Sequence, residues 1–228
     1  MAHKKKQEQE SSFENVERAL SRTEQYIEEN QKSLTIIVLI IIGIVGAYLG
    51  YKRFYVTPRD AEAQQQMFVA EKYFEQDSFR LALEGDGQYP GFIQIIDDYG
   101  VTQSANLAHY YAGISNLHLQ NYEEAIEHLE DFSSNDIMIA PIALGAIGDA
   151  YVELGDPGKA AGYYKKAAEK SKNDYTAPIY FMKAGQIFEE LGKPKDALRM
   201  YQSIKEDYPQ SAEGRQIDKY IARASASM

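Results

Sequence analysis

The chain has 228 residues, of which 34 are acidic and 24 are Lys or Arg, and it contains no cysteine. The lack of cysteine excludes disulfides, thiolate catalysis and cysteine-based metal sites. Residues 60–228 hold 27 acidic and 15 basic residues, a net charge of −12. This negative balance argues against binding to nucleic acid or to an anionic lipid surface, because both need clustered Lys and Arg.

The first 33 residues are predicted to form a cytoplasmic tail with one short amphipathic helix. Residues 1–10 are too polar to form a core and are predicted to be disordered. Ser11 and Glu14 have the spacing of a capping box, and four apolar residues then recur at helical spacing: Phe13, Val16, Leu20 and Ile27. The helix is either a docking or dimerising element or a charged stalk that leads to the membrane.

Residues 34–51 read LTIIVLIIIGIVGAYLGY and contain no charged side chain. Eighteen residues at about 1.5 Å each give a helix of roughly 27 Å, close to the ~30 Å hydrocarbon core of a bilayer. The run is apolar all round, whereas a surface helix of a soluble protein has a polar face. We therefore predict one uncleaved transmembrane anchor over 34–53, with Tyr48, Tyr51 and Tyr55 at the membrane interface.

The orientation of this anchor depends on the positive charges at its two ends. Lys52, Arg53 and Arg59 follow the run, whereas six Lys and Arg residues are spread over the tail before it. Counted over the whole tail, the positive-inside rule favours a cytoplasmic N-terminus, with the large C-terminal part on the far side.

Beyond Pro58 the sequence favours helices and contains three related segments. In each segment a glycine precedes an alanine by twelve residues, a leucine lies between them, and a large apolar residue follows the alanine by four. The residues at these four positions are Gly113, Leu119, Ala125 and Leu129, then Gly148, Leu154, Ala160 and Tyr164, and then Gly185, Leu191, Ala197 and Tyr201. The period is therefore 35 and then 37 residues.

This pattern is typical of helical hairpins that stack into a solenoid. The glycines and alanines remove side-chain volume where the two helices of a hairpin meet. The turns LGDP and LGKP place glycine at the end of one helix and proline at the start of the next. Tyr164 and Tyr201 are predicted to fill space against the neighbouring hairpin.

Residues 105–210 resemble the tetratricopeptide repeat family. His109, Leu144 and Phe181-Met182 stand where that family often has tryptophan, and Pro209 fits its closing proline. The predicted fold is all-α: a single N-terminal transmembrane helix, then a tetratricopeptide-repeat helical-hairpin solenoid over 60–228 with a C-terminal capping helix. The predicted parts are a divergent first repeat over 60–104, repeats at about 105–138, 139–175 and 176–210, and a cap over 211–224.

The first repeat is predicted to carry an insertion. Residues 79–82 (FRLA) look like the start of a second helix, but Gly85–Gly91 (GDGQYPG) interrupts it. Residues 92–99 (FIQIIDDY) then match residues 201–208 (YQSIKEDY) in pattern, which predicts that the helix resumes after the insertion.

The layout of a short tail, one span and an acidic repeat domain with the opening FRLALEGDG resembles the ancillary SecYEG translocon subunit family. Members are membrane-anchored repeat proteins beside the secretion channel that associate with periplasmic chaperones. The resemblance implies a bacterial inner-membrane protein with a periplasmic repeat domain. It also implies translocon subunits, exported chains or chaperones as partners.

The sequence contains no recognisable catalytic constellation. His109, His118 and His128 are nine and ten residues apart, not the three or four that place two metal ligands on one helix face. They are interpreted as surface or packing residues. Acidic pairs such as Glu123-Glu124 do not converge, because adjacent residues of a helix do not face each other. With no phosphate loop and no Gly-x-Ser-x-Gly motif, we predict no enzyme, no metal and no cofactor.

Candidate partner-binding residues lie on the first helices of the repeats, where a solenoid usually presents a groove for a peptide. They are Asn106, Tyr110, Asn116, Asp149, Glu153, Lys183, Gln186 and Glu190. The negative charge favours basic or neutral partners. The predicted function is a membrane-anchored scaffold for protein–protein interactions. The alternative is a structural or assembly subunit, in which the tail and span oligomerise and the repeats act as a spacer.

Overall fold

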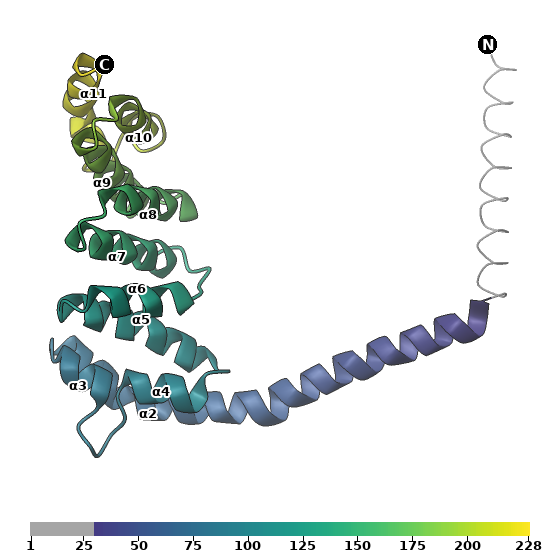
Figure 1. Ribbon diagram of the computed structural model, residues 1–228. Helices are drawn as coiled ribbons and strands as arrows, with labels where there is room; N and C mark the ends of the chain where they lie inside the picture. The colour runs from purple at the N-terminus through teal and green to yellow at the C-terminus, as the bar shows by residue number, and fades with distance from the viewer. Residues whose placement is uncertain (1–29) are drawn as a thin grey trace, which may run out of the picture. The chain divides into compact units, whose positions relative to one another are not determined.

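The computed structural model describes residues 30–228, which fall into two units, one ending at Tyr55 and one running from Val56 to Met228. The predicted tail helix, in which Tyr26 stands next to Ile27, lies outside the described residues. Residues 30–228 form helices and no β-strand, so the predicted all-α class is confirmed (Figure 1).

The first unit holds the apolar run. Residues 30–51 are α-helical, and η1 (Lys52–Val56) continues as a π-helix. The helix with this run is long and apolar enough to cross a membrane, because an 18-residue window reaches a mean hydropathy of 2.5 and none of it is buried. Tyr51 and Tyr55 stack, with their ring centroids 5.2 Å apart.

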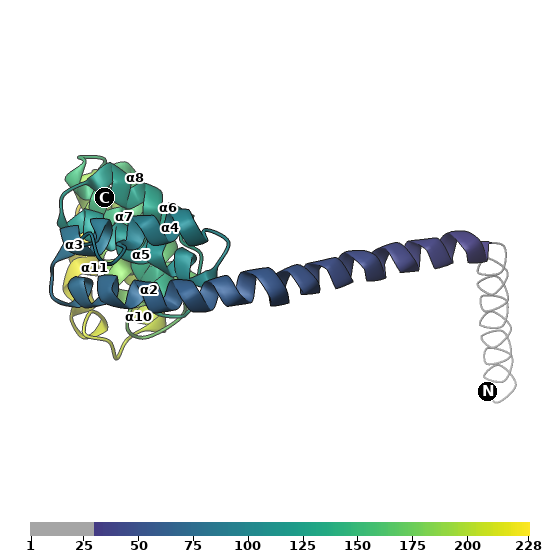
Figure 2. The same ribbon diagram turned by 90° about the horizontal axis from the view of Figure 1, so that it is seen from below.

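The second unit is a stack of helical hairpins, as the repeat pattern predicts (Figure 1). It begins with α2 (Thr57–Glu75), α3 (Phe79–Glu84) and α4 (Phe92–Tyr99). Three hairpins follow: α5 (Gln103–His118) with α6 (Tyr122–Asp131), α7 (Ile139–Glu153) with α8 (Pro157–Lys170), and α9 (Ala177–Glu190) with α10 (Pro194–Asp207). The chain ends with η2 (Gly214–Gln216), a 3-10 turn, and α11 (Ile217–Ala226). Figure 2 shows α2 lying across one end of this stack.

Within each hairpin a glycine of the first helix lies directly under a large side chain of the second. The pairs are Gly113 with Leu129, Gly148 with Tyr164, and Gly185 with Tyr201. A Cβ added to these glycines would lie 2.4, 2.6 and 2.3 Å from the facing side chain, which is closer than van der Waals contact. Tyr164 and Tyr201 therefore pack mainly against the first helix of their own hairpin. They also contact the next element along the stack, as predicted. Their neighbours there are Tyr180 and Tyr220, with centroids 6.3 and 5.5 Å away.

The turns inside the hairpins have the chemistry that the sequence predicts. Gly155 and Gly192 follow the ends of α7 and α9 with φ of 72° and 66°, and Pro157 and Pro194 begin α8 and α10. In the first hairpin the same place is taken by Gln120, with φ of 64°. This left-handed conformation is unfavourable for a residue with a Cβ, such as glutamine, but not for glycine.

The loop 85–91 separates α3 from α4 and is tied down by one carboxylate. Asp86 Oδ1 accepts hydrogen bonds from the backbone N–H groups of Gln88 and Tyr89 at 2.9 and 2.7 Å. Asp86 Oδ2 accepts a third from the hydroxyl of Tyr73 at 2.8 Å. A Cβ on Gly91 would lie 2.1 Å from the carbonyl oxygen of Leu83. The two ends of the insertion can therefore meet only because a glycine stands there.

The last helix begins later than the predicted cap at residue 211. Ser211 Oγ accepts a hydrogen bond from the backbone N–H of Gly214 at 2.9 Å. A Cβ on Gly214 would lie 2.2 Å from the carbonyl oxygen of Tyr208. This local turn uses the first residues of the predicted helix, so that α11 starts at Ile217.

Candidate partner-binding surface

Asp149 of α7 and Lys183 of α9, two of the candidate residues, are in direct contact. Lys183 Nζ lies 2.6 Å from Asp149 Oδ1, and the hydroxyl of Tyr164 donates to the same oxygen at 2.5 Å. Lys183 Nζ also lies 5.1 Å from the ring centroid of Tyr164, within reach of a cation–π interaction. Both charged side chains are 39% exposed. The pair therefore joins two hairpins and still presents part of each side chain to solvent.

The following hairpin repeats this arrangement with different residues. The hydroxyl of Tyr201 donates to Glu189 Oε2 at 2.8 Å. Arg223 of α11 donates from Nε and Nη2 to the two oxygens of Glu189 at 3.0 and 2.5 Å. The step from acid to cation is 34 residues in both cases. Asp149 and Glu189 thus each bind the tyrosine of their own hairpin and a cation from the next first helix or from α11.

These contacts shift pKa values without preparing any group for proton transfer at neutral pH. The hydrogen bond from Arg223 is the main cause that lowers the pKa of Glu189 below its usual value. Burial is the main cause that raises the pKa of Tyr164 and of Tyr201. Glu189 therefore stays ionised and both tyrosines stay protonated, which suits a structural ion-pair network.

Tyr110 and Tyr180 make the aromatic part of the first-helix surface. A Cβ on Gly145 of α7 would lie 2.1 Å from the ring of Tyr180, so the glycine makes room for this ring. Tyr110 is half-buried and packs against Phe132, with centroids 5.3 Å apart. Burial raises the pKa of both tyrosines. Both rings are therefore held in place by packing within the domain.

Gln186 and Glu190 are exposed, and both line one open cleft of about 590 Å³. Arg223 and Glu189 form another part of its wall. Glu153 is also exposed, and its Oε2 lies 3.5 Å from the hydroxyl of Tyr122. Of the eight candidate residues, these three are the most accessible to a partner.

The side chains of the two candidate asparagines form hydrogen bonds within their own domain. Asn106 donates to the carbonyl of Ser133 and accepts from its N–H, both at 2.9 Å. Asn116 is only 5% exposed, and its Oδ1 accepts a hydrogen bond from Asn121 Nδ2 at 3.1 Å. Because their amide groups are already used, we do not place Asn106 and Asn116 among the residues that contact a partner.

One contact that the sequence spacing did not reveal is a histidine pair between α5 and α6. The Nδ1 atoms of His109 and His128 lie 3.3 Å apart, so one ring can donate a hydrogen bond to the other. Burial, with a smaller contribution from His109, lowers the pKa of His128. Residues 30–228 contain no group of three or more side chains arranged to hold a metal ion.

Residues 146–212 match the family model of the tetratricopeptide repeat. This stretch carries tetratricopeptide repeats. It includes α8, α9 and α10 complete, together with both members of the Asp149–Lys183 pair. Tetratricopeptide repeats are typical of proteins that bind other proteins. No curated protein matches the sequence.

Proposed function

We propose that this chain is a membrane-anchored scaffold that binds protein partners through the first helices of its repeats. The observation that carries the proposal is the surface of α7 and α9, where the half-exposed Asp149–Lys183 pair lies between fixed aromatic rings. Fixed side chains lose little entropy on binding, which favours recognition. The apolar helix before the repeats is long enough to serve as the anchor.

The kind of partner follows from charge and from the resemblance of the layout to the ancillary SecYEG translocon subunit family. The acidic repeat domain favours basic or neutral chains. The resemblance suggests a cytoplasmic N-terminus, a periplasmic repeat domain at the bacterial inner membrane, and a channel subunit, exported chain or chaperone as partner. An anchor in the same membrane raises the effective concentration of both molecules, so a groove with low affinity for the partner is sufficient.

Site-specific photo-crosslinking in native membranes tests this proposal. A photo-reactive amino acid at Gln186 or Glu190, both exposed on α9, is expected to give adducts with another protein that mass spectrometry can identify. The matched control carries the same photo-reactive amino acid in place of Glu206, which is exposed on α10. Adducts with channel subunits or exported chains from α9 alone would support the translocon scaffold.

A second crosslinker at Tyr26 separates the scaffold from the assembly subunit. If Tyr26 gives self-adducts while Gln186 and Glu190 give no more adducts than Glu206, the scaffold proposal is wrong. The tail and span would then carry the assembly, with the repeats as a spacer.

A further inference from the structure

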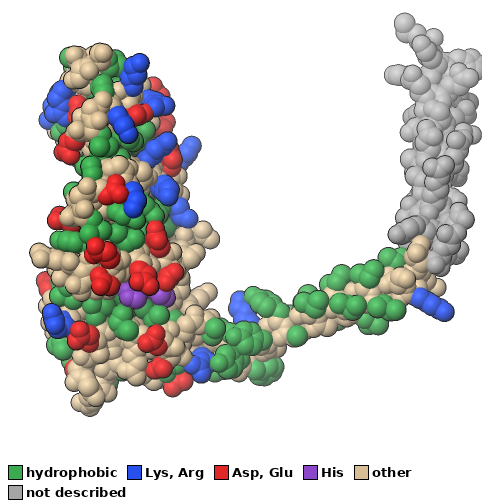
Figure 3. All heavy atoms as spheres, viewed as in Figure 1, with side chains coloured by type: hydrophobic (Ala, Val, Ile, Leu, Met, Phe, Trp, Pro, Cys, Tyr) green, Lys and Arg blue, Asp and Glu red, His purple; other side chains and the backbone are tan. Residues whose placement is uncertain are grey.

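Charge is unevenly distributed along the repeat domain. Residues 60–158 contain 18 acidic and two basic residues, a net charge of −16, whereas residues 159–228 contain nine acidic and 13 basic residues, a net charge of +4. Figure 3 shows the same change, with Lys and Arg gathered towards the C-terminal helices. The sign changes between α6 and α8, the second helices of consecutive hairpins.

The outer faces of these two helices carry opposite charges at equivalent positions. When the helices are aligned on Ala125 and Ala160, three acidic residues of α6 correspond to three lysines of α8: Glu124 to Lys159, Glu130 to Lys165, and Asp131 to Lys166. The other two acidic residues of α6, Glu123 and Glu127, correspond to Gly158 and Gly162. Nine of these ten residues are exposed, and Gly162 is half-buried. The two faces are therefore complementary in both charge and size.

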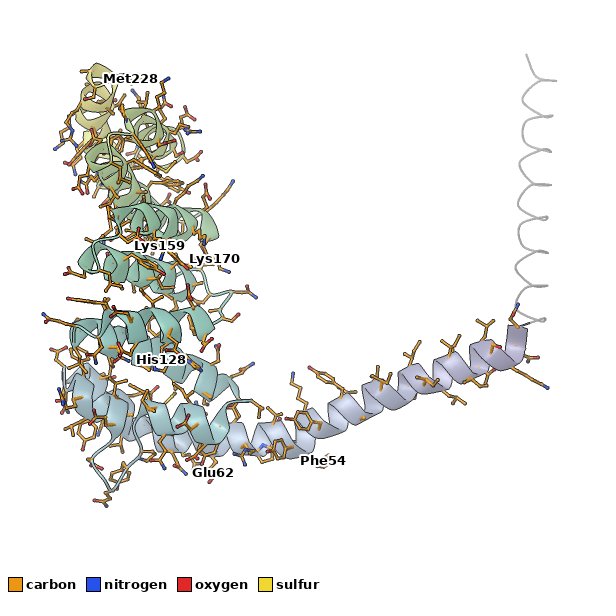
Figure 4. The ribbon with its side chains drawn as sticks, in the orientation of Figure 1. Phe54, Glu62, His128, Lys159, Lys170 and Met228 are labelled. Carbon is orange, nitrogen blue, oxygen red and sulfur yellow. The ribbon has the colours of Figure 1, made fainter. Side chains whose placement is uncertain are left out.

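Within residues 30–228 the two faces are satisfied only in part, and Glu130 accepts a hydrogen bond from the hydroxyl of Tyr163 on α8. Within residues 30–228, none of the five carboxylates of α6 has an ion-pair partner at 4.0 Å or less. On α8, Lys159 and Lys165 pair with Asp156 and Glu169 at 3.5 and 3.7 Å, and such exposed pairs add little stability. Figure 4 shows Lys159 and Lys170 near the two ends of α8.

Among the described residues 30–228, none packs against Gly162 closely enough to require a glycine there. A Cβ there would meet no atom within 4 Å, although the Cβ of a residue at Gly148 would lie 2.6 Å from Tyr164. Glycine inside a helix lowers its stability relative to alanine. Together with Gly158, one turn earlier on the same face, it leaves a strip without side chains where another helix can approach closely.

We propose that the outer faces of α6 and α8 form a two-fold interface between two copies of this chain. A two-fold axis running between the helices sets α6 of each copy against α8 of the other, which is an isologous contact. The carboxylates then meet lysines, and Glu123 and Glu127 lie over the strip at Gly158 and Gly162. A second copy is the matching occupant because the same chain carries both halves of the complement, one on α6 and one on α8. Anchoring in one membrane raises the effective concentration of the copies.

Charge exchange in the full chain, reconstituted in lipid vesicles, tests this interface. The acidic variant carries Lys159→Glu, Lys165→Glu and Lys166→Glu, and the basic variant carries Glu124→Lys, Glu127→Lys and Asp131→Lys. Because the chain has no cysteine, a Met228→Cys substitution takes one donor or acceptor dye for energy transfer. Each variant alone is expected to associate about tenfold or more weakly than the unaltered chain. A mixture of the two is expected to associate again, because each helix then meets its opposite charge.

The controls separate this interface from the fold and from the anchor. The variant Lys193→Glu, Lys195→Glu, Lys219→Glu has the same change in charge elsewhere and is expected to associate like the unaltered chain. Gly162→Leu is expected to abolish association while circular dichroism shows an intact helical domain. The proposal is overturned if the unaltered chain shows no more energy transfer than the same sample diluted with an excess of unlabelled chain. It is equally overturned if the mixture fails to associate, or if every combination associates alike.

Discussion

Arg223 and Glu189 form a bidentate ion pair that ties α11 to the hairpin before it. Lys183 and Asp149 hold the same relation one repeat earlier. The C-terminal helix thus supplies the cation that a further repeat would otherwise supply. It therefore caps the array through a specific charge as well as through its apolar side chains.

Replacing Arg223 by methionine should lower the free energy of unfolding by about 1–2 kcal/mol. Hydrogen bonds to charged groups are worth about 1.5–3 kcal/mol, but Arg223 is 58% exposed and solvent screens part of this. Urea unfolding followed by circular dichroism measures the change. Lys219→Met, which removes an exposed lysine of the same helix, should have less effect, and equal losses for both variants would contradict the role of the ion pair.

Protonation of His128 should lower the stability of the folded chain as the pH falls. Burial and His109 lower the pKa of His128 in the folded chain below 6.5, so the unfolded chain takes up the proton first as pH falls. The stabilisation is complete above pH 6.5 and is lost between 6.5 and the lower folded pKa. Melting temperatures at about pH 7.5 and about pH 5.5 should differ less in His128→Gln. An unchanged difference in that variant would exclude His128 as the cause.

Two glycines inside helices should respond oppositely to alanine. Gly148→Ala forces a Cβ against the ring of Tyr164, so a loss of about 1–3 kcal/mol is expected from overpacking. Gly162→Ala meets no atom within 4 Å, so the gain in helix propensity should raise stability by about 0.5–1 kcal/mol. Thermal unfolding of the two variants at a dilution where chains do not associate measures both effects. No loss of stability in Gly148→Ala would refute the close packing at Gly148, and a loss in Gly162→Ala would contradict the open space at Gly162.

Gln120→Gly should stabilise the first hairpin. Gln120 has φ of 64°, and the equivalent turn residues Gly155 and Gly192 show that glycine suits this place. The gain expected from relieving the left-handed conformation is about 1 kcal/mol. The reverse change, Gly155→Gln, should destabilise the second hairpin by a similar amount. Urea midpoints that do not move in opposite directions would contradict this reading of the turn.

The sequence predicted the hairpins well because their periodicity depends on contacts within one hairpin. The glycine-to-alanine spacing marks where two adjacent helices touch, and Gly148 with Tyr164 shows that contact directly. The Asp149–Lys183 ion pair could not be predicted from either helix alone, since it depends on the angle between consecutive hairpins. Asp149 and Lys183 are 34 residues apart, and so are Glu189 and Arg223. Because this spacing is close to the repeat period, it could have suggested that the two residues of each pair are neighbours.

The sequence could not decide whether a polar side chain faces a partner or another residue of its own domain. Asn106 and Asn116 stood at suitable positions on a first helix, yet their amides bind Ser133 and Asn121. An asparagine suits both roles equally well, and only the path of the neighbouring loop distinguishes them. Gln186 and Glu190 stayed accessible because they face an open cleft.

The ion pairs of the repeats also give the domain a direction. Asp149 and Glu189 each take their cation from the residue 34 positions later, so the last two hairpins each depend on their C-terminal neighbour. Fraying of α11 removes the cation from Glu189, and loss of α9 then removes it from Asp149. Opening should therefore spread from the C-terminal end, and hydrogen exchange should reach the amides of α10 before those of α8.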